Sequence, residues 1–441
     1  MKLERPVARA LAIAVLSGAP AFLAHCSAPS DAAPASPETV ADTGSPTTPL
    51  AEAGVDADSA PAVFAPAAHR PWPVLVRGTG HVLQPLTLVT LVAENDDLAT
   101  QLFAFGDTAI TSEWWRETGG EYGVGTANTS VHVTVPAITH DLTQTDVTAT
   151  IERAIASSLA PAANENTLYL LYVPAPYEAT GLGSTAYHGA LTTTNTSYAV
   201  VSRVGEEADQ SVLDSLTERA SHEIIEAATD TRGGWRLPEA SATPWNDLDT
   251  SIWRSSQPGV IENGDLCEGS RVREPLAGGF LFQRSWSNAA AAKNGGANDP
   301  CVPARSEPYF NVSIASDWIS IAAGATITIP FSGWSSGATS SWFVNAGVNH
   351  GQGSLSGLST VPGGGLKLVT SLGVGTAPKC GPRQAVNNGT TGTLTVTAPS
   401  DAAKGDYAVI WINSFREEPS TCNPRPDVDW HHYWPVGVHV E

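Results

Sequence analysis

The periodicity of apolar residues changes at about residue 305, and this change limits the folds that the chain can adopt. Before it, strand-like and helix-like segments follow one another. The expected strands are 86–93, 131–135, 168–173 and 198–202, and the expected helices are 96–105 and 146–158, the second capped by Thr145. This order predicts an α+β domain over residues 70–305, with helices packed on a mixed sheet.

Residues 306–441 show a different pattern, in which polar and apolar side chains alternate with a period of two. The runs 311–314, 326–329 and 393–397 carry this alternation, and Gly- and Ser-rich turns separate them. Short strands at this spacing predict an all-β, immunoglobulin-like sandwich. The run 404–411 resembles the tyrosine-bearing corner strand of such domains, although an ordinary buried strand with a Tyr would look the same.

Residues 1–26 have the layout of an export signal, with three basic residues ahead of an Ala- and Leu-rich run that is too short to span a bilayer. The run ends in Leu-Ala-His-Cys, which resembles the lipobox of bacterial lipoproteins and would be acylated at Cys26. His25 stands where a small residue is expected. The alternative is cleavage after Ala21 and release of a soluble protein, and either route leads out of the cytoplasm.

Residues 27–69 are rich in Ala, Pro, Ser and Thr and contain acidic residues but no Lys or Arg. This composition predicts a disordered, acidic linker that repels itself and extends. The whole chain has a formal net charge of −21, which repels phosphate backbones and anionic lipid surfaces. Nucleic acid is therefore excluded as an expected partner, and a membrane is expected only through the N-terminal lipid anchor.

The chain contains five cysteines. Cys26 stands alone, whereas the other four form two local pairs, Cys267 with Cys301 and Cys380 with Cys422. One lipidated cysteine and two disulfides would account for all of them. Such disulfides suit an oxidising compartment outside the cytoplasm.

A helix expected over residues 211–230 carries the residues with the clearest chemical potential. His222 and Glu226 are four residues apart, so their side chains are neighbours on one helical face and could hold one ion. Zincin-type hydrolases begin their metal site in this way, and Glu223 occupies the position of their general base. The opposite face is an apolar stripe made of Leu213, Leu216, Ala220, Ile224 and Ala227.

A third protein ligand must come from outside this helix. Glu262 and Asp265 both lie just ahead of Cys267, and the sequence does not choose between them. The cofactor expected is one divalent metal, with zinc as first choice, although a Glu in place of a second His also suits harder ions such as Ca²⁺ or Mn²⁺. Asp230 shares a helical face with Glu223 and is expected to orient it, cap the helix or contact the site.

The segments 220–230, 262–267 and 283–288, together with Trp235 and Cys301, resemble the phosphate-induced, Exordium-like secreted proteins of plants and related secreted bacterial and fungal proteins. The shared motif order spans residues 72–302. The resemblance implies a zincin-like, metalloprotease-type fold in an extracellular or wall-associated protein, but no settled reaction. It also includes the segment 187–189, and His188 there could reach the site as a ligand or substrate contact, or simply be a satisfied core residue.

These observations favour a metal-dependent hydrolase outside the cytoplasm, monomeric, with a peptide or cell-envelope polymer as substrate. In this hypothesis Glu223 is the catalytic base. The competing hypothesis is a non-catalytic surface protein, stabilised by the metal, that binds glycan or protein. A blander alternative is that helix 211–230 is merely amphipathic, which the distances between its polar residues and Glu262 or Asp265 would decide.

Overall fold

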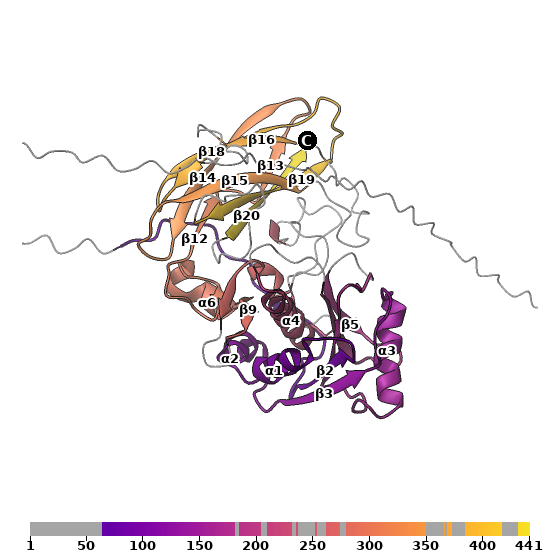
Figure 1. Ribbon diagram of the computed structural model, residues 1–441. Coiled ribbons are helices and arrows are strands. Elements are labelled where there is room, and N and C mark those ends of the chain that lie inside the picture. Colours follow the sequence, from indigo (N-terminus) through magenta and orange to yellow (C-terminus); the bar gives the residue numbers. More distant parts are fainter. Residues whose placement is uncertain are drawn as a thin grey trace, which may run out of the picture. The chain divides into compact units, whose positions relative to one another are not determined.

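The structure is a computed structural model, and its element order combines helices with many β-strands (Figure 1). It describes residues 64–180, 185–203, 210–231, 235–236, 252–253, 262–273, 279–349, 366, 368–372, 384–416 and 431–441. Within these ranges, every helix is too short or too polar to cross a bilayer.

A five-stranded sheet lies at the centre of the N-terminal part, with strand order β3-β2-β4-β6-β5 (Figure 1). Its strands are β2 (Thr87–Ala93), β3 (Thr129–Val135), β4 (Thr167–Val173), β5 (Ala186–Ala190) and β6 (Ser197–Ser202). Four of them run parallel, and β5 runs antiparallel to β6 at the edge. The four strands expected from the sequence are therefore confirmed, and β5 is additional.

Helices cover both faces of this sheet. Helices α1 (Ala99–Ala109), α2 (Glu113–Gly119) and α4 (Val212–Thr229) share a buried apolar cluster with one face, and α3 (Gln144–Ala156) shares another with the opposite face. All seven residues of β4 are buried, as expected for a central parallel strand covered on both sides. The mixed α/β architecture predicted for this part of the chain is confirmed.

Side-chain caps define where three of these helices begin, and Ser112 is the N-cap of α2. The prediction that Thr145 caps α3 is wrong, because Thr143 is the N-cap. Thr143 and Asp146 form a capping box: Asp146 N–H donates to Thr143 Oγ1, and Thr143 N–H donates to Asp146 Oδ2. The pattern of apolar residues predicted the position of the helix. The identity of the N-cap depends instead on which hydroxyl accepts a hydrogen bond from the first free N–H groups of the helix. Ser211 is the N-cap of α4, where its side chain accepts from Asp214 N–H, and Asp230 is the C-cap residue.

A set of short elements follows α4. They are β7 (Trp235–Arg236), which pairs with β1 (Val76–Arg77), the 3₁₀ turn η3 (Asp265–Cys267), β8 (Arg271–Arg273), β9 (Leu281–Gln283), β10 (Ser285–Trp286), α6 (Asn288–Ala292), η4 (Lys293–Gly296) and β11 (Cys301–Val302). A disulfide joins Cys267 to Cys301, which confirms that predicted pair. Cys26, Cys380 and Cys422 lie outside the described residues.

The C-terminal part is built from strands. One sheet has the order β12-β14-β18-β16 and the other β13-β20-β19-β15-β17. Their bounds are β12 (Phe310–Ile314), β13 (Trp318–Ile321), β14 (Thr326–Ser335), β15 (Trp342–Asn349), β16 (Val369–Leu372), β17 (Gln384–Val386), β18 (Thr391–Thr397), β19 (Tyr407–Phe415) and β20 (His431–Val440). Trp334 and Leu394 from the first sheet and Trp342 and Ile410 from the second belong to one buried cluster, so the two sheets share a core. Tyr407 is buried at the start of β19.

Residues 64–69, which the sequence analysis assigned to the end of a linker over residues 27–69, make specific contacts. Ala67 N–H donates to Asn388 Oδ1 at 2.8 Å. The ring of His69 stacks on Trp334 with centroids 3.8 Å apart. Residues 64–69 thus belong to the folded part, because the Asn388 amide and the Trp334 ring give this Ala-rich segment specific partners that composition does not reveal.

Candidate metal centre

Helix α4 presents His222, Glu223 and Glu226 to a largely enclosed space. The sequence indicated that the face of His222 and Glu226 lies opposite the apolar stripe, where a surface helix would expose it. Glu223 and Glu226 are only 5% and 3% exposed, because β5 and β9 both contact α4. The interpretation of α4 as a merely amphipathic surface helix is therefore not supported.

The predicted pair on α4 has the spacing of two ligands of one ion. His222 Nε2 lies 2.9 Å from Glu226 Oε2. Ligand atoms about 2 Å from a tetrahedral zinc ion are themselves about 3.3 Å apart. His222 Nδ1 faces Gln283 Oε1 at 3.2 Å, and Gln283 Nε2 donates to Gly264 O at 2.9 Å. Gln283 thus fixes the orientation of the imidazole, as the outer partners of metal-binding histidines do.

His188 reaches the same site from β5. Its Nδ1 lies 3.0 Å from Glu223 Oε2 and 3.7 Å from Glu226 Oε2, and its Nε2 lies 3.4 Å from Glu262 Oε2. The structure thus brings His188, which the sequence analysis left between a site contact and a core residue, into direct contact with three of the predicted site residues.

Glu262 and Asp265 both lie at the site, but beside different imidazoles. Asp265 Oδ1 is 3.9 Å from His222 Nε2, whereas Glu262 faces His188. Asp265 also supports its neighbours, since its N–H donates to Glu226 Oε1 at 3.1 Å and its Oδ2 accepts from Glu262 N–H at 3.0 Å. The two carboxylates that the sequence could not separate therefore have different positions.

Two groups of three residues in the described part of the chain bring one possible ligand atom each within 4.8 Å of one another. One group is His222, Glu223 and Glu226, and the other is His188, Glu226 and Glu262. Of the other predicted site residues, Asp230 is buried at the C-cap of α4, directly after the helix. It fits the predicted capping position and belongs to neither group.

The electrostatics of the site reflect crowded carboxylates. Burial, and next the negative charge of Glu226, raise the pKa of Glu262 and of Asp265 well above their ordinary values. Burial acts in the same direction on Glu226, but the adjacent His222 outweighs it and holds the pKa of Glu226 below its ordinary value. Burial opposes protonation of His222, yet Glu226 and the other carboxylates raise its pKa well above the ordinary value.

Gly264 allows the segment after Glu262 to approach α4 closely. A Cβ at this position would lie 2.6 Å from Glu226 Oε1 and 2.9 Å from His222 Nδ1. Thr229 Oγ1 lies 3.2 Å from Asn263 Oδ1, which holds the same segment against the end of α4. Nothing in the sequence indicated that Gly264 approaches α4 or that Asn263 contacts Thr229. Nothing in it indicated a role for Gln283 either.

Gly264→Ala is expected to weaken binding of a divalent metal at this site by about 10- to 100-fold, because the added methyl group displaces Glu226 and His222. Competition with a chromophoric chelator measures the affinity. Gly120→Ala is the matched control, since nothing lies within 4 Å of its added Cβ. Equal affinity in both variants would show that the close approach at Gly264 does not position the ligands.

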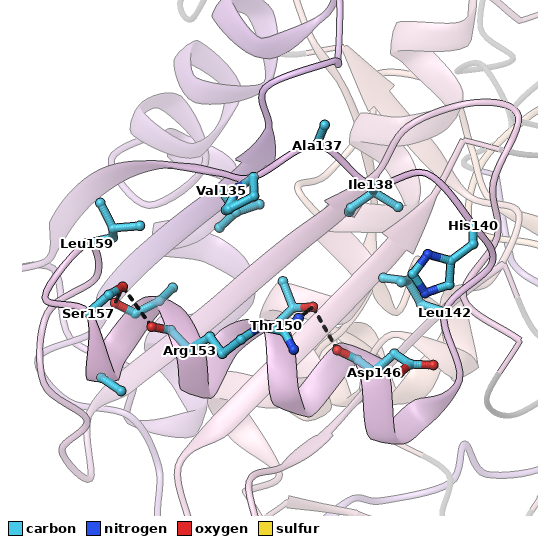
Figure 2. A pocket seen from close by; sticks show the side chains of 13 residues that line it. Val135, Ala137, Ile138, His140, Leu142, Asp146, Thr150, Arg153, Ser157 and Leu159 are labelled. Atoms are coloured by element: carbon cyan, nitrogen blue, oxygen red, sulfur yellow. Dashed lines mark hydrogen bonds between the residues drawn. The ribbon is translucent and has the colours of Figure 1, made fainter.

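A separate pocket of about 700 Å³ lies between α3 and the chain that follows β3 (Figure 2). Val135, Ile138 and Leu142 contribute apolar side chains to it, and His140 and Arg153 add polar groups. None of the candidate metal ligands lines it. The chemistry predicted from the sequence therefore lies elsewhere, on the opposite side of the sheet from α3.

Comparison with known proteins adds little to this description. No protein-family model matches the chain, and no curated protein matches it. Among solved structures, domains 4 and 5 of the S-layer protein SbsC share 15% identity over 30% of this chain and 53% of that chain, with a TM-score of 0.18. A conjugative transposon lipoprotein from Bacteroides eggerthii shares 13% identity over 29% of this chain and 95% of its own, also with a TM-score of 0.18. Likenesses this low carry no argument about fold or function.

Proposed function

We propose that this chain is a metal-dependent hydrolase outside the cytoplasm, with a zincin-like metal helix and peptides as its substrates. The observation that carries the proposal is the pair formed by His222 Nε2 and Glu226 Oε2 at 2.9 Å, with Glu223 next to it on the same helix. The Exordium-like motif order across residues 72–302 and the immunoglobulin-like character of the C-terminal sheets belong to the same proposal.

The residues present fit a divalent ion. Glu262 Oε2 is buried and makes no hydrogen bond within the described part of the chain, and a buried carboxylate oxygen without a hydrogen-bond donor is costly. Imidazole nitrogens and carboxylate oxygens are the donors that zinc accepts, and an oxygen-rich set also suits Mn²⁺. When bound, such an ion polarises a carbonyl oxygen and makes a water molecule more acidic.

The roles of the chain's own residues follow from their positions. His222 and Glu226 would hold the ion, and Asp265, which lies beside His222, would be a further ligand. Glu223 Oε2 accepts a proton from the attacking water as general base. His188 Nδ1, 3.0 Å away, donates a hydrogen bond to the Glu223 carboxylate and orients it.

An extended peptide suits the approach to the site. The side chains of His188, His222 and Asp265 keep 21%, 18% and 23% of their surface exposed, so the site opens toward solvent on their side. His188 belongs to β5, which ends the five-stranded sheet, and a peptide laid along an edge strand would pass this residue. A cell-envelope polymer remains the other substrate class, in line with the export signal and the lipobox-like Cys26.

The test uses the full chain, purified and analysed for metal, with a broad peptide library as substrate. Glu223→Gln is expected to retain the metal and lower turnover by about 10²- to 10⁴-fold, because a general base contributes this much. Glu165→Gln, at an exposed position, is the control and is expected to behave like the wild type.

Two other results would contradict the proposed hydrolase function. Bound metal with no turnover in either protein would favour a surface protein that binds glycan or protein, with the ion as a stabilising element. The contact between Glu223 and His188 supports this second candidate, since a carboxylate oxygen that already accepts from an imidazole is less available to accept a proton from water. Absence of bound metal would exclude both functions.

A further inference from the structure

The candidate metal centre contains more ligands than one ion uses. A catalytic zinc ion takes about three protein ligands, whereas the two groups described above comprise five residues and share only Glu226. One group lies on α4 alone. The other adds His188 from β5 and Glu262 from the segment ahead of η3, so different parts of the fold supply it.

We propose that the centre binds two divalent cations that share the carboxylate of Glu226, the first beside His222 and the second between His188 and Glu262. The second position rests on the proposed metal-dependent function and goes beyond it, since that function needs only the first ion. Paired ions of this kind clamp both the attacking and the leaving oxygen in two-metal hydrolases.

The geometry of His188 supports the second position. Its Nδ1 faces Glu223 Oε2 at 3.0 Å, so that Nδ1–H donates a hydrogen bond to Glu223 and the Nε2 lone pair points the other way. Nε2 lies 3.4 Å from Glu262 Oε2, close to the separation of about 3.3 Å that two ligands of one tetrahedral ion adopt. A carboxylate that orients a histidine from behind is the usual outer partner in metal sites.

Glu262 provides an independent observation. Glu262 is only 8% exposed, and its Oε2 has no hydrogen-bond partner among the described residues. Its backbone N–H, by contrast, is bound by Asp265. A buried oxygen left without a donor, aimed at an imidazole nitrogen, is where a cation would replace the missing donor.

Glu226 is placed to serve both ions. Its Oε1 accepts the N–H of Asp265, which fixes the carboxylate group. Its Oε2 lies 2.9 Å from His222 Nε2 and 3.7 Å from His188 Nδ1. Glu226 also offers a ligand atom within 4.8 Å of ligand atoms of His188 and Glu262, so this one carboxylate lies within reach of both proposed ions, as a bridging ligand does.

The charge of the centre also supports two cations. Glu223, Glu226, Glu262 and Asp265 all lie within 4 Å of one of the two imidazoles. One divalent cation would compensate half of the charge of four ionised carboxylates, whereas two would compensate all of it. Burying uncompensated carboxylates is costly.

The test measures how many ions the full chain binds. Apoprotein made with a chelator is reloaded with Zn²⁺ or Mn²⁺, and the metal content is measured together with the electron paramagnetic resonance spectrum of the Mn²⁺ form. The expected result is about two ions per chain and a spin-coupled Mn²⁺ pair. Glu262→Gln and His188→Ala are each expected to leave about one ion and no coupling, and Glu178→Gln, at an exposed position, to leave both.

One ion per wild-type chain that Glu262→Gln retains would overturn the second position and leave the proposed function standing. No bound ion would contradict both. Two ions that persist in Glu262→Gln and His188→Ala would show that the second lies elsewhere. The wild-type stoichiometry and spectrum need no variant, so a variant that fails to fold does not remove the test.

Discussion

Glu226→Gln is expected to release the bound metal and abolish hydrolysis together. Glu226 belongs to both ligand groups, and its Oε2 directly contacts His222 Nε2. Gln has the same shape, so packing around the buried side chain is kept, but the amide lacks the charge that a cation requires. We expect metal affinity to fall by at least about 100-fold and turnover by at least about 1000-fold.

The measurement is the metal-to-protein ratio after dialysis, followed by turnover with and without added metal. Glu178→Gln makes the same change at an exposed position and is expected to keep both properties. Glu223→Gln provides a contrast, since it should lose turnover while retaining metal. A Glu226→Gln protein that binds metal and turns over like the wild type would place the ion away from α4.

Arg284→Met is expected to destabilise the fold by about 3–5 kcal/mol, because it removes one partner of a buried ion pair. The Arg284 side chain is 1% exposed, and its Nη2 lies 2.7 Å from Asp299 Oδ2. The same guanidinium donates to Ser270 Oγ, to Pro303 O and to the carbonyl of Cys301. Methionine fills a similar space but leaves Asp299 and these acceptors without their donor.

Chemical denaturation of the full chain measures this change as a lower free energy of unfolding. Arg273→Met is the matched control, because Arg273 is half-exposed and pairs with Asp214 at 2.9 Å. An exposed pair of this kind contributes about 1 kcal/mol or less. If both variants lost the same stability, the network around Arg284 would not hold the segment between Ser270 and Cys301 in place.

Local sequence patterns predicted local structure well. The apolar runs gave four strands of the five-stranded sheet. For β2, β4 and β6 the reason is that a strand buried on both faces must be apolar along its length, whereas β3, at the edge, is only partly buried. Helix α4 begins after Ser211 and ends before Asp230 as expected, since a polar cap and a helical period of apolar residues are both encoded within one segment. Where the sequence offered two nearby hydroxyls, at Thr143 and Thr145, periodicity could not choose the cap.

The candidate site was predictable only in part. His222 and Glu226 are neighbours in any helix, so their proximity follows from spacing alone. The pair Cys267 and Cys301 was suggested by counting cysteines and is confirmed. The position of His188 beside Glu223, the contact of Gln283 with His222 and the close approach at Gly264 had no local signal, because each depends on a contact across at least 19 residues of chain.

The change of periodicity near residue 305 determined the two kinds of architecture, helices on a mixed sheet and then strands alone. It did so because the spacing of apolar side chains along a helix or strand indicates which of its faces is buried. The tertiary structure decided that the polar face of α4 is enclosed, that Glu262 faces His188 while Asp265 faces His222, and that residues 64–69 join the fold. These outcomes depend on which distant segments come into contact. The order of the strands in the sheet and the course of the loops determine those contacts, and the residue pattern within a single segment does not.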